Sequence, residues 1–164
     1  MEFCTLLSKQ LIETARRRIV TQAGISEADL RRAVSDLYYA VFHRVCESLI
    51  EPIGFDTDNK AFLDTFKTIY RLPDHGLLEK RCKEALGHSF TPEIKAFAQC
   101  IIGLKNKRHD ADYDPLAKFA ISEVENDLNL TQAALAGFSS CDPQERARFA
   151  FFVALDGRRG KVLL

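Results

Sequence analysis

The chain has 164 residues, which is the size of one ordinary domain. Its 23 Lys and Arg residues balance 23 Asp and Glu residues, which excludes a protein that coats nucleic acid by overall positive charge but leaves room for a local basic groove. Hydrophobic residues make up 46% of the chain and charged residues 28%, and this globular composition excludes a disordered protein.

The cysteines and the apolar runs indicate the compartment. Five cysteines are widely spaced and never paired as C-x-x-C, so a disulfide framework or a structural zinc site is not expected. No apolar run approaches the ~20 residues of a membrane helix. Charges at Lys9, Glu13 and Arg16 interrupt the basic-then-apolar order of a signal peptide. We expect a cytoplasmic protein with no membrane contact, no cofactor and no metal.

Apolar residues recur at helical spacing along most of the chain, which predicts an all-α fold. The first helix is expected over residues 3–21. The second is expected over residues 27–51, because Ser26 and Asp29 form the pattern of a capping box and a proline and a glycine follow the helix.

The later helices are predicted mainly from their start signals. Two short helices are expected over residues 61–70 and 75–86. Thr91-Pro92 and Asp114-Pro115 are cap-then-proline signals, which predict helices over residues 92–108 and 115–137. A last short helix is expected over residues 143–157, followed by a basic tail of Arg158, Arg159 and Lys161.

These elements predict an antiparallel bundle of four to five helices with short accessory helices, formed by residues 1–138. Residues 139–164 are predicted to be a C-terminal short helix and a basic tail, packed on the bundle or on a partner subunit. The helix over residues 27–51 has apolar residues over well over half of its circumference. It is therefore expected to be central, or to be shared between the bundle and the second subunit of a homodimer.

A polar line follows one edge of that helix, formed by Arg32, Asp36, Tyr39 and His43 at steps of four, three and four. One interpretation is a half-buried ladder in which Arg32 pairs with Asp36. The other is that the line borders a polar groove, with His43 as a proton donor or a phosphate contact, since the pKa of histidine lies near about 6.5.

The segment KRHDADYDP, residues 107–115, is the densest polar cluster in the chain. Arg108 extends an apolar stripe and must find an acceptor, because an unpaired buried charge is costly. One interpretation is a corner between two helices, pinned by Arg108, Asp112 and Tyr113. The other is an anion site in which Arg108 and Lys107 hold phosphate and His109 transfers a proton.

The stretches LRRAVSDLYYAVFHRV (residues 30–45) and LKNKRHDADYDP (residues 104–115) together resemble the HEPN domain family. The similarity is to the branch with Y-Y-A-x-F-H in its second helix and R-x-x-A-D-Y-D-P at a later corner. It implies a helical bundle that usually dimerises around a cleft. Many members of the family are metal-independent ribonucleases of toxin–antitoxin or defence systems, while others bind RNA or nucleotides without catalysis or pair with a small nucleotidyltransferase.

The resemblance implies an RNA- or nucleotide-binding protein, with metal-independent cleavage by an endoribonuclease as one form of that function. The candidate catalytic residues are Arg108, His109 and His43. The candidate binding residues are Arg32, Tyr39, Lys107, Asp112 and Tyr113. A homodimer and a nucleotidyltransferase antitoxin are the expected protein partners.

The chain departs from the family in its nucleolytic motif, an arginine followed after about four to six residues by a histidine. Here the histidine is adjacent to Arg108, and Tyr113, Asp114 and Pro115 stand at the motif positions. This departure favours an alternative function, a non-catalytic interaction module whose polar corner is structural.

Overall fold

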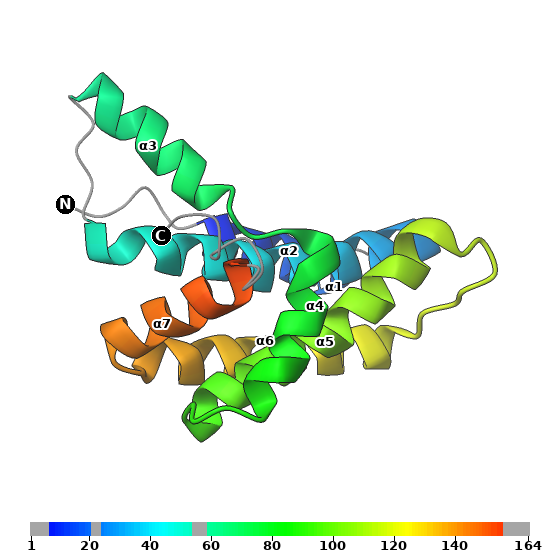
Figure 1. The fold of residues 1–164 in the computed structure, drawn as a ribbon. Coiled ribbons are helices and arrows are strands. Elements are labelled where there is room, and N and C mark those ends of the chain that lie inside the picture. The colour runs from blue at the N-terminus through cyan, green and yellow to red at the C-terminus, as the bar shows by residue number, and fades with distance from the viewer. Residues whose placement is uncertain (1–6, 21–23, 54–58, 156–164) are drawn as a thin grey trace.

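The structure is a computed structural model that describes residues 7–20, 24–53 and 59–155. Within these ranges the fold is all-α, as predicted, with seven α-helices, one short 3-10 helix and no strand. The elements are α1 (Leu7–Val20), α2 (Glu27–Ile50), η1 (Glu51–Ile53), α3 (Lys60–Tyr70), α4 (His75–Leu86), α5 (Pro92–Tyr113), α6 (Ile121–Ser140) and α7 (Pro143–Ala154) (Figure 1).

Helix α2 is the central element of the bundle. It begins with the predicted capping box, because the Ser26 hydroxyl accepts a hydrogen bond from the Asp29 N–H while the Asp29 carboxylate accepts one from the Ser26 N–H. Sixteen of its 24 residues are buried, and it contacts α1, α3, α5, α6 and α7. These five neighbouring helices cover the broad apolar surface of α2, so no second subunit is needed to explain it.

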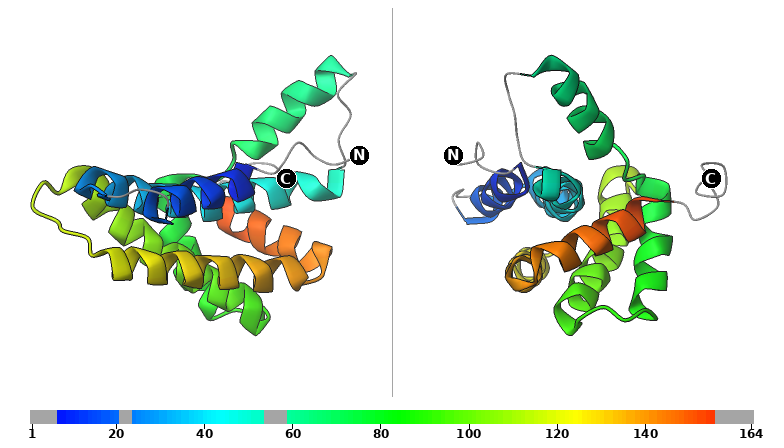
Figure 2. Two further views of the ribbon diagram at one scale, coloured as in Figure 1. Left: turned by 180° about the vertical axis from the view of Figure 1, so that it is seen from behind. Right: turned by 60° about the vertical axis from the view of Figure 1, so that its left-hand side comes forward.

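Helices α1, α2 and α6 run alongside one another and are seen nearly end-on in the right-hand view of Figure 2. Helix α1 lies antiparallel to α2, since Ser8 at its start contacts Glu47 and Arg18 near its end contacts Asp36. Helices α4, α5 and α7 lie to the right of these three helices in the same view, and α4 packs against both α5 and α7.

Three phenylalanine rings in mutual contact close the core where α5, α6 and α7 meet. The ring of Phe97 lies 4.2 Å from that of Phe138, and the Phe149 ring meets both rings edge-on. All three side chains are fully buried. Helix α7 is therefore attached to the bundle through the core itself.

Helix α3 projects from the bundle and has no fully buried residue (Figure 1). It is held to α2 near its C-terminus, where the Tyr70 hydroxyl meets Nδ1 of His43 at 2.7 Å. The Asn59 side chain caps its first turn by accepting a hydrogen bond from the Phe62 N–H.

The structure corrects the predicted boundary between α5 and α6. Helix α5 continues five residues past Arg108, to Tyr113, and Asp114-Pro115 does not start a helix. Asp114 instead accepts a hydrogen bond from the Leu116 N–H within a loop, and α6 begins only at Ile121. The polar segment is thus the last turns of one helix and the start of a loop.

Other predicted boundaries agree closely with the structure, although some lie outside the described residues. Helix α4 spans the predicted residues, α6 continues past its predicted end to Ser140, and α7 ends at Ala154, before the predicted residue 157. The predicted ends of the first helix and the basic tail of Arg158, Arg159 and Lys161 lie outside the described residues.

Candidate functional site

The two segments that carry the HEPN resemblance meet in space, where the first half of α2 faces the last turns of α5. Arg108 donates a hydrogen bond from Nη2 to the Tyr39 hydroxyl at 3.0 Å. Four residues further along α5, Asp112 accepts a hydrogen bond from the Ser35 hydroxyl at 2.6 Å. The structure therefore joins residues that lie 69 to 77 positions apart in the sequence.

Arg108 is enclosed by one carboxylate and three aromatic rings. Its Nε lies 2.6 Å from Oδ2 of Asp112, but the N–H does not point at the carboxylate, so the contact is an ion pair without an aligned hydrogen bond. The guanidinium carbon lies 5.4 to 5.9 Å from the ring centres of Tyr38, Tyr39 and Tyr113. With 22% of its side chain exposed, Arg108 borders solvent rather than facing it fully.

His43 lies one turn beyond Tyr39 and faces α3. Its Nδ1 is 2.7 Å from the Tyr70 hydroxyl, and its ring stacks on the Tyr70 ring. Burial lowers the pKa of His43, and the nearby His75 lowers it further. At neutral pH His43 is therefore a neutral imidazole engaged in a fold contact between α2 and α3.

His75 is a member of this cluster that sequence reasoning missed, because it stands alone in the sequence at the start of α4. Its Nδ1 lies 2.9 Å from the Tyr38 hydroxyl, and its ring stacks on Phe42 at 3.8 Å. Partial burial lowers the pKa of His75, and the positive charge of Arg108 adds to the effect. No local motif signals this placement, since it depends on how α4 crosses α2.

The lowered pKa of His43 predicts a loss of stability on acidification. Below about pH 6.5 the unfolded chain takes up a proton at this histidine that the folded chain resists, so the free energy of unfolding falls as the pH falls. We expect the drop between about pH 7.5 and pH 5.5 to be smaller in His43→Asn, which keeps a polar partner for Tyr70. Urea unfolding at both pH values checks this. An equal drop in wild type and variant would contradict it.

Two of the predicted site residues, Lys107 and His109, have acidic neighbours of their own, and the His109 Nδ1 lies 3.7 Å from Oδ1 of Asp110. Lys107 forms ion pairs with Glu123 at 2.9 Å and Asp127 at 2.7 Å, so it ties α5 to α6. His109 is 72% exposed, with its ring 5.3 Å from that of Tyr113. Lys107 thus has its charge compensated by carboxylates, whereas His109 is open to a ligand.

The predicted pairing of Arg32 with Asp36 along α2 is not formed. Asp36 pairs with Arg18 of α1 at 2.9 Å rather than with Arg32. Arg32 is exposed, and it lines a shallow groove of about 520 Å³ together with Asp112 and Tyr113. The groove lies between the start of α2 and the end of α5.

Arg31 also lines this groove and is the second residue that sequence reasoning missed. It donates hydrogen bonds to the carbonyl oxygens of Ala111 and Asp114 at 2.9 Å, and to that of Ala117. One side chain of α2 therefore holds the end of α5 and the following loop in place. The sequence offers no signal for this role, because the acceptors are backbone atoms.

The site thus gathers Tyr39, Arg108, Asp112, Tyr113 and Arg32 at one end of the bundle. It has the exposed ring of Tyr113, the exposed cation of Arg32, and the Arg108 guanidinium, which is held by Asp112 and by tyrosine rings. These groups can stack on a planar ligand and contact an anion. The structure does not bring Lys107 into this set.

No family model, curated protein or solved structure matches this chain, so the HEPN resemblance stays a prediction. Among the described residues, no group of three or more His, Cys, Asp or Glu side chains is placed to bind one metal ion. None of the helices described in the structure has the length and apolar composition needed to cross a membrane.

Proposed function

We propose that this protein binds single-stranded RNA at the groove between the start of α2 and the end of α5. The observation that carries the proposal is the placement of Tyr113, whose side chain is among the most exposed aromatic groups of the described residues, at 64%. Its ring lies over the Arg108 guanidinium and borders the groove that Arg32 lines. An exposed ring beside cations is the arrangement on which unpaired bases stack.

The charges around Tyr113 indicate where the phosphate would lie. Asp110, in the last turn of α5, and Asp114, directly after the helix, are both exposed and would repel a phosphate near them. Arg32 lies on the α2 side and forms no ion pair within the described residues. A base on Tyr113 would therefore direct its phosphate toward Arg32, with Arg108 holding the ring from beneath.

His109 is the group in this set that could act in metal-independent cleavage, as the resemblance to ribonucleases implies. It is exposed next to Tyr113, so its imidazole could exchange a proton with the 2′-hydroxyl or with the leaving oxygen of a bound strand. His43 is less suited to this role, because its Nδ1 is engaged with Tyr70. Cleavage that persists in EDTA and is lost in His109→Ala would assign the activity.

A second candidate function is a non-catalytic interaction module. It is favoured by the closed contacts of the same segment, in which Arg108 pairs with Asp112, and Lys107 with Asp127. On this alternative the polar end of α5 only holds the fold. A homodimer and a nucleotidyltransferase partner are compatible with either candidate and remain predictions.

The RNA proposal is tested with a fluorescently labelled oligonucleotide in EDTA at two salt concentrations. Tyr113→Ala is expected to weaken binding by about tenfold, since base stacking on an aromatic side chain contributes about 1–3 kcal/mol. Tyr113→Phe should bind as wild type does. Arg32→Gln should weaken binding. It should also reduce the slope of log affinity against log salt concentration by about one, the change expected when one phosphate contact is lost.

The control variant is Lys80→Gln, which removes one exposed positive charge on α4, away from the groove. This variant should weaken RNA binding only slightly, because it removes one positive charge that does not lie at the groove. If wild type shows no salt-dependent binding, or if Tyr113→Ala binds as tightly as Tyr113→Phe, the interaction-module alternative is preferred.

A further inference from the structure

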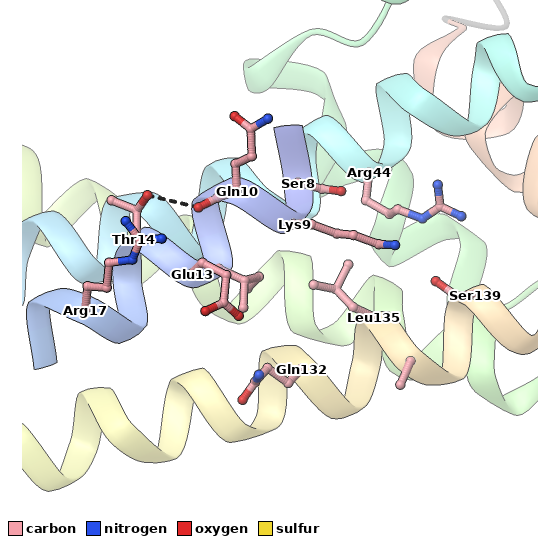
Figure 3. Close-up of a pocket in the computed structure, with 12 residues that line it drawn as sticks. Ser8, Lys9, Gln10, Glu13, Thr14, Arg17, Arg44, Gln132, Leu135 and Ser139 are labelled. Atoms are coloured by element: carbon pink, nitrogen blue, oxygen red, sulfur yellow. Dashed lines mark hydrogen bonds between the residues drawn. The ribbon is translucent and has the colours of Figure 1, made fainter. Parts of the chain in front are cut away.

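We propose a second binding site, for an amphipathic anion, in the groove between α1 and α6. This groove has a volume of about 990 Å³ and is separate from the RNA groove, with which it shares no residue. Figure 3 shows its two walls, formed by side chains of α1 and of α6, with Arg44 of α2 at one end. Its volume lies at the upper end of the range of about 300–1,000 Å³ that small-molecule sites occupy.

The groove has an apolar floor that a ligand could cover. Ile12 of α1 and Leu135 and Ala136 of α6 contribute this surface, and Ala136 is exposed. Helices α1 and α6 touch each other far less than α1 touches α2, which leaves the space between them open. An apolar body of a ligand would gain from covering this floor.

Charged groups at the Arg44 end of the groove leave an excess of positive charge. Arg44 has only 6% of its side chain exposed and contacts Glu51 at 2.5 Å and Glu47 at 3.8 Å. Glu51 also pairs with Arg146, so two arginines and two carboxylates balance. Lys9 lines the same groove and forms no ion pair with any residue that the structure describes, while Glu13, another charged group of α1 near it, pairs with Arg16 at 3.1 Å.

Glu47 lies beside Arg44 and accepts hydrogen bonds from Ser8 of α1. Burial raises the pKa of the Glu47 carboxyl, although hydrogen bonds from the Ser8 N–H and hydroxyl oppose the effect. In addition, Nε of Arg44 is buried and has no hydrogen-bond acceptor among the described residues. Most buried donors in proteins do find a partner, so Arg44 keeps one donor that the described residues do not satisfy.

Figure 3 shows the Lys9 side chain extending along the groove in the direction of Arg44 and Ser139. A carboxylate or phosphate at this end would meet the Lys9 ammonium in the field of Arg44. The Ser139 hydroxyl lines the same end and could donate a further hydrogen bond. The apolar body would then lie along Leu135 and Ala136. The ligand class is therefore a small molecule with one anionic head and an apolar tail or ring.

The probe for this site is 8-anilinonaphthalene-1-sulfonate, an aromatic anion that fluoresces in apolar surroundings, and dodecanoate and dodecyl phosphate are the competitors. Saturable binding at one site is expected, and the stronger competitor identifies the preferred head group. Ala136→Phe fills the groove and should weaken probe binding by at least about tenfold. The matched control is Ala133→Phe on the same helix, where the alanine is exposed but does not line the groove.

Lys9→Gln should weaken probe binding by about threefold or more and reduce its dependence on salt. Both alanine variants replace exposed residues, so melting curves matching wild type will show that they are folded. Absence of saturable binding in wild type, or equal affinity in Ala136→Phe and Ala133→Phe, would overturn the site. Unchanged affinity in Lys9→Gln would overturn its preference for anions.

Discussion

Replacing Phe138 by alanine is expected to lower the free energy of unfolding by about 3–5 kcal/mol, the range typical of a fully buried phenylalanine. Its ring stacks on Phe97 and meets Phe149 edge-on, so the cavity would open where α5, α6 and α7 join. The Arg44 guanidinium also lies 5.5 Å from the Phe138 ring centre and would lose that contact. Denaturant unfolding monitored by circular dichroism measures the change.

The control for this prediction is Leu116→Ala, since the Leu116 side chain is 84% exposed in the loop before α6. Its effect should stay within about 0.5 kcal/mol. Phe149→Ala should resemble Phe138→Ala and leave a single transition, because α7 is fastened to the bundle core. A separate early transition for α7 would show instead that residues 143–154 fold as their own unit.

Replacing Arg108 by alanine is the second large change, with an expected loss of about 2 kcal/mol. The variant leaves Asp112 without its cation and the Tyr39 hydroxyl without its donor. The estimate lies below the value for a fully buried pair, because about a fifth of each side chain is exposed and solvent screens the interaction.

A double-mutant cycle separates this ion pair from the rest of the cluster. Arg108→Ala and Asp112→Ala, alone and together, should show a coupling of about 1 kcal/mol or more in urea unfolding. Asp112→Asn keeps an acceptor for the Ser35 hydroxyl and should cost less than Asp112→Ala. Additive effects of the two alanine substitutions would mean that the two side chains do not stabilise each other.

Helix positions follow closely from local signals in this chain. The capping box of Ser26 and Asp29 forms where the sequence indicates it, and α5 begins at the predicted Pro92. These signals are read from a few adjacent residues whose side chains bond to their own backbone. The broad apolar surface of α2 likewise predicted a helix that is central or shared with a second subunit, and the structure places α2 at the centre of the bundle.

The end of α5 could not be predicted from local signals, because a residue of α2 decides it. Asp114-Pro115 has the pattern of a helix start, but the Arg31 guanidinium donates hydrogen bonds to the carbonyl oxygens of Asp114 and Ala117. In a helix beginning at Pro115, the Ala117 carbonyl would instead accept from a backbone N–H one turn later. The i, i+4 pair of Arg108 and Asp112 supports the extra turns of α5.

Part of the candidate site could be predicted, namely the contacts between the two helices that carry the motifs. The proximity of Tyr39, Arg108 and Asp112 follows from the pairing of two motif-bearing helices, which the resemblance implied. The contributions of His75 and Arg31 depend on how α4 crosses α2 and on backbone acceptors in a loop. Neither can be read from residue type and spacing.

The most direct test of the RNA proposal is to map the contact surface by nuclear magnetic resonance on the labelled full-length chain. On titration with a short single-stranded RNA in EDTA, we predict that the largest amide shifts fall at Ala28, Arg32, Asp112 and Tyr113, which line the groove between α2 and α5. Shifts confined to other surfaces, such as the groove between α1 and α6, or no shifts at all, would contradict it.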